Sequence, residues 1–172
     1  MKLGIDASLR SSAYCLSEND KIVELFIQQS QEKSYEKLLL ENKEAFRKIL
    51  NYLTKKYKID HVNLEDLSLG SKSAFLDIIS ANYWNHRCLL YEFNLDFSVY
   101  SPHQWRKIHN IIPNTKKNKE WKEELGKDYL KILTIEKMDE NNKKIIFDFC
   151  KKNKLKKKTE YDLADSFWIT KC

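Results

Sequence analysis

The chain has 172 residues, of which 42% are hydrophobic, and its 31 lysines and arginines outnumber 25 acidic residues to give a net charge of +6 at pH 7. This length fits one domain, residues 1–172, that buries a core without disulfides or a structural metal, and the hydrophobic fraction excludes a disordered chain. The positive charge favours a polyanionic partner, most simply a nucleic acid.

Three strands are predicted at the start of the chain. They cover residues 2–7, 13–17 and 22–28, where short apolar runs are bounded by polar and turn-forming residues. Asn19-Asp20 is typical of a hairpin turn between the second and third strands. We therefore expect these strands to be antiparallel neighbours.

Helices and strands alternate in the middle of the chain. Residues 35–57 have a helical period with one apolar stripe, residues 61–67 alternate as a strand does, and residues 97–100 predict a fifth strand. A long helix is predicted over residues 73–93, and its apolar residues cover a wide arc. A helix of this kind is buried on more than one side, so one side can pack on the sheet and the other on a second subunit.

The last third of the chain predicts helices. Pro102 interrupts the chain after the fifth strand, and residues 111–125 are rich in lysine without a clear period. Helices are predicted over residues 120–138 and 141–152, and an amphipathic helix over 160–172. This order of elements indicates an α/β fold, a mixed five-stranded sheet flanked by helices.

The cysteines and the apolar runs bear on the location of the protein. Cys15, Cys88, Cys150 and Cys172 lack C-x-x-C spacing, so we expect reduced thiols in a cytoplasmic protein. No apolar run approaches the roughly 18 residues that span a membrane. We therefore expect no membrane partner.

Four acidic residues are the candidates for a functional site. Asp6 follows the first strand, Glu65 lies in the fourth, and Asp162 and Asp165 are spaced i, i+3 on one face of the last helix. We expect the last two in the first turn of that helix, where the helix dipole favours negative charge. Taken singly, each has a common structural role: a turn residue, a solvent-facing strand residue or a helix cap.

Taken together, these acids predict a metal site. Four carboxylates at the ends of two strands and a helix repel one another unless cations join them, and Mg²⁺ prefers oxygen ligands. Two such ions about 4 Å apart can activate water and stabilise the leaving oxygen of a phosphodiester. That chemistry agrees with a basic chain that binds nucleic acid.

The order of four motifs resembles the RuvC family of Holliday-junction resolvases, and in particular the shorter members carried by bacteriophages. The motifs are GIDASLRSSAYCL, VNLEDLSLGSKSAF before a long helix, SPHQWRKI and TEYDLADSFWI. The last is the most specific, because the family's final helix carries D-x-A-D followed by apolar residues. The resemblance covers nearly the whole chain.

The resemblance implies a ribonuclease H-like fold and a magnesium-dependent endonuclease. Asp6, Glu65, Asp162 and Asp165 would be its catalytic residues and metal ligands, with two Mg²⁺ ions for which Mn²⁺ can substitute. Members of the family act as homodimers in which each subunit nicks one of two symmetric strands of a four-way DNA junction. The helix at 73–93 would form much of the dimer interface.

The resemblance also implies basic side chains that hold the scissile phosphate. One candidate is Arg106 or Lys107. A second is in the next basic segment, where Lys117, Lys119 and Lys122 are equivalent by sequence, and each could instead be a solvated lysine. The tryptophans are candidates for stacking on bases, namely Trp105, Trp121 and Trp168, although a buried core position is favoured for Trp168.

Three other functions compete with the resolvase. A non-catalytic protein could bind branched DNA on the same fold. A nuclease for RNA–DNA hybrids usually carries its glutamate on the first helix, whereas Glu65 lies in a strand after that helix. A sugar-kinase-like ATPase needs a glycine-rich phosphate loop after the first aspartate, and ASLRSS contains no glycine, so we set this function aside.

Overall fold

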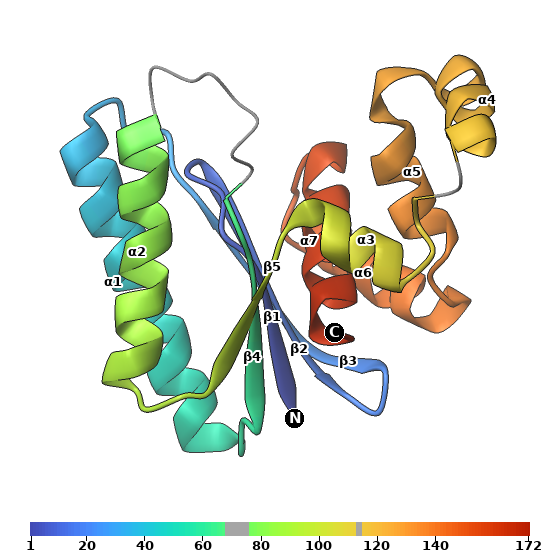
Figure 1. Ribbon diagram of the computed structural model, residues 1–172. Helices are drawn as coiled ribbons and strands as arrows, with labels where there is room; N and C mark the ends of the chain where they lie inside the picture. The colour runs from blue at the N-terminus through green and yellow to red at the C-terminus, as the bar shows by residue number, and fades with distance from the viewer. Residues whose placement is uncertain (68–75, 113–114) are drawn as a thin grey trace.

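A mixed five-stranded sheet forms the centre of the protein (Figure 1). The computed structural model describes residues 1–67, 76–112 and 115–172, without the side chains of residues 115–118, 125 and 127. The strands have the order β3-β2-β1-β4-β5. They are β1 (Lys2–Asp6), β2 (Ser11–Glu18), β3 (Lys21–Gln29), β4 (His61–Glu65) and β5 (Phe97–Tyr100).

The first three strands are antiparallel, and β4 and β5 are parallel to β1. Asn19 and Asp20, with φ of 48° and 63°, form the turn between β2 and β3, as a two-residue hairpin turn of type I′ requires. The predicted hairpin and the predicted α/β fold with a mixed five-stranded sheet are confirmed.

Helices cover both faces of this sheet (Figure 1). On one side lie α1 (Tyr35–Lys56) and α2 (Leu76–Glu92), and the other helices are on the opposite side. These are α3 (Pro102–Ile108), α4 (Thr115–Leu125), the 3-10 helix η1 (Gly126–Asp128), α5 (Tyr129–Glu136), α6 (Glu140–Lys152) and α7 (Lys157–Thr170). No helix in the described ranges is long and apolar enough to cross a membrane.

The helices after β5 differ from the prediction. α3 was not predicted, although Ser101 and Gln104 form a reciprocal capping box and Pro102 occupies its first turn, all of which favour a helix start. The helix predicted over 120–138 is divided at Gly126, which has φ of 76°. For the helix predicted over 73–93, residues 73–75 lie outside the described ranges.

The start of the last helix is a further correction. α7 begins at Lys157 rather than at residue 160, so Asp162 and Asp165 lie beyond its first turn. The helix dipole acts mainly within that turn and therefore does not explain these two acids.

Alternation along the strands separates two apolar cores. Leu3 and Ile5 pack with α1 and α2, whereas Ala13 and Cys15 pack with α7. Gly4 lies between Leu3 and Ile5, and α7 crosses the sheet against it. Residues at i and i+2 share a face of a strand, so Asp6 is on the α7 side with Gly4.

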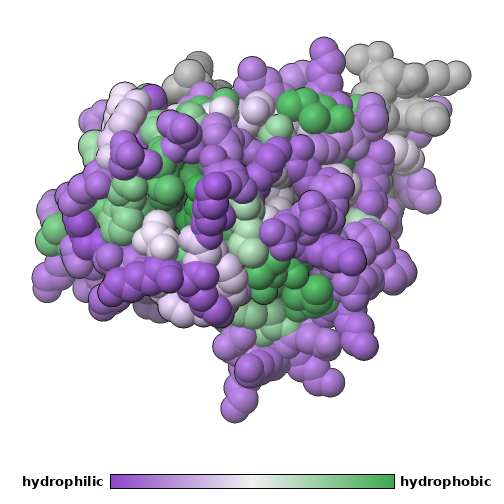
Figure 2. Space-filling view, turned by 90° about the horizontal axis from the view of Figure 1, so that it is seen from below, coloured by the Kyte–Doolittle hydropathy of each residue, from purple (hydrophilic) through white to green (hydrophobic). Residues whose placement is uncertain are grey.

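Side-chain hydrogen bonds hold the carboxyl end of α7 against the sheet. Asn63 Nδ2 of β4 donates to the carbonyl oxygen of Ile169 at 3.0 Å, and Ser17 Oγ of β2 donates to Thr170 Oγ1 at 2.8 Å. Glu65 is two residues after Asn63, so it also lies on the α7 side. Figure 2 shows the end of the sheet where β1 begins, opposite to the end that carries Glu65, as a mainly hydrophilic surface with separate apolar areas.

Candidate metal centre

Three predicted acids meet where the parallel strands β1 and β4 end. Asp6 and Glu65 are the last residues of these strands, and Asp165 comes from α7. Carboxylate oxygens of the three residues all lie within 4.8 Å of one another. Asp165 is buried, with 7% of its surface exposed. We call these three residues the acid cluster.

Asp162, the fourth predicted acid, is not part of the acid cluster. It lies one helical turn before Asp165, and its Oδ2 accepts a hydrogen bond from Ser11 Oγ at 2.9 Å. Its negative charge still raises the pKa values of Asp6, Glu65 and Asp165. Asp162 is therefore a neighbour of the acid cluster, held in place by β2.

Burial and mutual repulsion raise the pKa values of the whole cluster. Desolvation is the largest cause for each carboxyl group, and the neighbouring carboxylates add to it. The pKa of Asp6 is well above its usual range, that of Glu65 is raised to about 8, and that of Asp165 to about 6. The deprotonated acids are therefore unfavourable together unless positive charge joins them.

Two oxygens of the acid cluster have no partner in the described part of the chain. Glu65 Oε2 and Asp165 Oδ1 are buried without a hydrogen bond among the described residues. A buried polar atom without a partner is costly, and carboxylate oxygens are the ligands that Mg²⁺ prefers. The cluster thus fits a divalent cation, because it offers negative charge, oxygen ligands and two oxygens that no other group occupies in the described structure.

Arg106 is the basic side chain that the structure brings to the acid cluster. Its Nη2 lies 3.2 Å from Asp165 Oδ2, and its guanidinium group lies over the ring of Trp105 at 4.4 Å from the centroid. Its positive charge lowers the pKa values of all three acids. Of the two sequence candidates in α3, Arg106 therefore faces the cluster, whereas Lys107 is exposed.

Two of the other predicted basic residues have described side chains that do not pair with the acids. Lys119 and Lys122 lie exposed on α4 and form no ion pair within the described ranges. The side chain of Lys117 lies outside the described part of the structure. Lys158, which was not predicted, lowers the pKa of Asp162. Its i, i+4 spacing from Asp162 was the sequence signal for this proximity.

Two of the candidate stacking tryptophans belong to the core. Trp105 is completely buried and Trp168 is 9% exposed. The indole nitrogen of Trp168 donates to the carbonyl oxygen of Thr134 at 2.8 Å. Base stacking is therefore excluded for Trp105 by its burial, and the core position expected for Trp168 is confirmed. Trp121 is partly buried against the same core.

Without divalent cations, we expect the free energy of unfolding to fall by a few kcal/mol as the pH rises from about 4.5 to about 8. The pKa of Glu65 is raised from 4.5 to about 8 in the folded protein. Between these values the folded state keeps a proton that the unfolded chain has released, so rising pH favours unfolding. Urea denaturation in EDTA at pH 5 and pH 8 measures the effect.

The matched variant for this experiment is Glu65→Gln, which removes the titrating group but keeps its shape. We expect a flatter dependence of stability on pH in this variant. An unfolding free energy that rises with pH between pH 5 and pH 8 in the parent protein would contradict the assigned pKa direction.

The protein is similar to known proteins in its three-dimensional structure, whereas comparison of its sequence gives no match. No family model and no curated protein matches the sequence. A structure of Thermus thermophilus RuvC in complex with a Holliday junction substrate has a TM-score of 0.60 at 10% identity, covering 98% of this chain and 88% of that chain. Another Thermus thermophilus RuvC structure has a TM-score of 0.58 at 10% identity, with coverages of 98% and 90%. The chain therefore has a RuvC-like, ribonuclease H-like fold.

Proposed function

We propose that this protein is a metal-dependent endonuclease that cuts branched DNA, with the four-way junction as its main substrate. The observation that carries this proposal is the acid cluster, in which three carboxylates from β1, β4 and α7 lie within 4.8 Å of one another. Two of its buried oxygens have no partner among the residues that the structure describes. The shared fold with a RuvC that was solved in complex with a Holliday junction supports the choice of substrate.

Asp6, Glu65 and Asp165 would hold Mg²⁺ or Mn²⁺, and Asp162 would complete a site for a second ion. Bound divalent cations would activate a water molecule and stabilise the leaving oxygen of a phosphodiester. Arg106 would hold a phosphate oxygen beside Asp165, which its Nη2 contacts at 3.2 Å, since guanidinium groups bind phosphate through charge-assisted hydrogen bonds. The products would carry 5′-phosphate and 3′-hydroxyl ends.

The DNA backbone would extend from the acid cluster across a basic surface. The net charge of +6 favours this partner. Lys107, Lys119 and Lys122 are exposed on the helices that follow β5. We propose that they contact phosphates, as does Lys117 in the same basic segment. We further propose that the chain acts as one cytoplasmic domain.

We also propose a homodimer formed through α2. Trp84 and Tyr91 of this helix are 53% and 67% exposed, whereas Leu89 and Leu90 are buried against the sheet. Large exposed aromatic side chains are typical of protein interfaces. A second copy on this surface would provide two acid clusters, one for each of two symmetric strands.

The test of the proposed function is cleavage of a labelled synthetic four-way junction. We expect paired, symmetric nicks in Mg²⁺ or Mn²⁺, none in EDTA, and little competition from linear duplex DNA. Sedimentation in the same buffer should give twice the chain mass of 20.6 kDa. Tight binding without nicks would instead identify a non-catalytic junction-binding protein, and preferential cutting of an RNA–DNA hybrid would identify a hybrid nuclease.

A further inference from the structure

A polar pocket of about 310 Å³ is lined in part by Asp162. It is formed by the segment after β1, the end of β3 and the amino end of α7. The residues that matter here are Arg10, Ser11, Gln29, Lys156, Lys158 and Thr159. We call this site the basic pocket. None of its residues except Asp162 was singled out by the sequence analysis.

A chain of side-chain hydrogen bonds lines the basic pocket. Gln29 Nε2 donates to Thr159 Oγ1 at 3.1 Å and to Ser11 Oγ at 3.5 Å, and Ser11 Oγ donates to Asp162 Oδ2 at 2.9 Å. These hydrogen bonds join β2, β3 and α7. They fix the position of the pocket relative to Asp162, and therefore relative to the acid cluster. Thr159 Oγ1 accepts within this network, so its own hydroxyl proton can donate to a bound anion.

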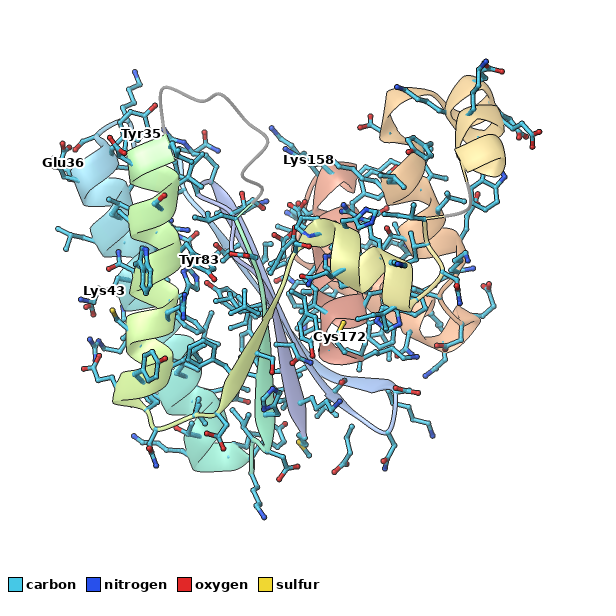
Figure 3. All side chains as sticks on the ribbon, in the orientation of Figure 1. Tyr35, Glu36, Lys43, Tyr83, Lys158 and Cys172 are labelled. Atoms are coloured by element: carbon cyan, nitrogen blue, oxygen red, sulfur yellow. The ribbon has the colours of Figure 1, made fainter. Side chains whose placement is uncertain are left out.

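Positive charge surrounds this polar lining. Arg10 donates to the carbonyl oxygen of Glu32, which holds its guanidinium group at the rim. Lys156 and Lys158 are exposed, and neither forms an ion pair with the residues that the structure describes. Figure 3 shows Lys158 at the amino end of α7, beyond the ends of the central strands. Three cations and one carboxylate, that of Asp162, thus line the pocket.

We propose that the basic pocket binds a backbone phosphate of the DNA next to the scissile phosphate, and so aligns the strand across the acid cluster. This inference rests on the proposed function. Three cations against one carboxylate leave the pocket positive, which attracts a phosphate anion. The link through Asp162 to the acid cluster favours a phosphodiester of the bound strand as that phosphate. Lys158 also lines a neighbouring pocket with Lys131 and Lys157, which continues the basic surface along α7.

The test compares two double variants that remove the same charge. K156A/K158A changes the basic pocket, and K48A/K55A removes two exposed lysines from α1, on the opposite side of the sheet (Figure 1). Junction binding is measured in EDTA over a series of salt concentrations. We expect K156A/K158A to bind roughly tenfold more weakly near 0.15 M salt. The slope of log affinity against log salt should fall by about 1, because the pocket holds one phosphate and each lost phosphate contact reduces the slope by about 0.9.

The K48A/K55A variant should bind the junction as the parent protein does. Misfolding would not explain weaker binding by K156A/K158A. Lys156 and Lys158 are both exposed, and the Lys156 side chain forms no capping hydrogen bond to α7. Thermal unfolding of both variants controls for it. Cleavage in Mg²⁺ should also decrease in K156A/K158A, through a higher KM.

Three results overturn the inference in distinguishable ways. If the parent protein does not bind the junction, the proposed function and the proposed role of the basic pocket are both wrong. If the parent protein binds the junction and both double variants bind it equally well, only the proposed role of the basic pocket is wrong. Calorimetry with inorganic phosphate gives the third result: phosphate binding that is lost in K156A/K158A without any change in junction affinity would assign the pocket to free phosphate.

Discussion

Replacing Asp6 by asparagine should lower metal-dependent junction cleavage by roughly a hundredfold or more while the protein stays folded. Loss of a residue that only orients a metal ligand costs about 10- to 100-fold, and we propose Asp6 as a ligand itself. Asparagine keeps the shape of the side chain but removes a negative charge at the centre of the acid cluster. Nicking assays and calorimetric titration with Mn²⁺ measure the two consequences.

The same substitution should stabilise the metal-free protein at pH 8. The pKa of Asp6 is raised by desolvation and by the charges of Glu65 and Asp165, so the neutral amide removes an unfavourable charge from the folded state. Loss of activity together with a higher melting temperature distinguishes a functional carboxylate from a misfolded variant. A merely structural aspartate would not give this combination.

The matched control is Glu18→Gln, which removes a carboxylate at the opposite end of the sheet. Glu18 is exposed at the end of β2, and we expect its variant to cut and unfold as the parent protein does. Cleavage by Asp6→Asn at the parent rate would falsify the assignment of Asp6 as a metal ligand.

Replacing Gly4 by alanine should destabilise the protein by about 3 kcal/mol or more and displace α7. A Cβ at this position would lie 2.1 Å from the carbonyl oxygen of Ser166 and 2.7 Å from the amide nitrogen of Thr170. Overpacking a core typically costs about 1–3 kcal/mol, and here the obstructing atoms belong to the backbone. Chemical denaturation measures the loss of stability.

The displacement of α7 should also reduce junction cleavage, because α7 carries Asp165 to the acid cluster. Gly126→Ala is the control for a general glycine effect. Apart from its chain neighbours, no described atom lies within 4 Å of a Cβ at Gly126. Its variant should therefore lose only about 1 kcal/mol from the positive φ of 76°. Equal stability of the two variants would contradict the close contact between β1 and α7.

The patterns that predicted the strands and their order depend on neighbouring residues, so packing between distant segments does not change them. Alternation, turn residues and a helical stripe were sufficient for β1 to β5 and α1, because each is read within a few neighbouring residues. The end of a strand is also local, which is why Asp6 and Glu65 were recognised as candidates. The helix predicted over 120–138 was less accurate, because its helical pattern is interrupted by Gly126, where the structure divides it into α4 and α5.

Other features depend on contacts between distant segments. The sequence alone treated Asp162 and Asp165 as equivalent, but Asp165 joins the acid cluster and Asp162 binds Ser11, 151 residues away. The choice of Arg106 over Lys107 follows from how α3 packs, with Trp105 buried and Arg106 directed to Asp165. Neither spacing nor residue type contains this information.

Local patterns in the sequence are enough to predict the α/β fold, the succession of strands and the four acids from which a metal site could be built. Packing between distant segments selects the three acids that meet, brings Arg106 beside them and forms the basic pocket next to Asp162. Close contact across the sheet is the cause, because α7 reaches β1 through the space left by Gly4, more than 150 residues earlier in the chain. That contact converts separate carboxylates into one site.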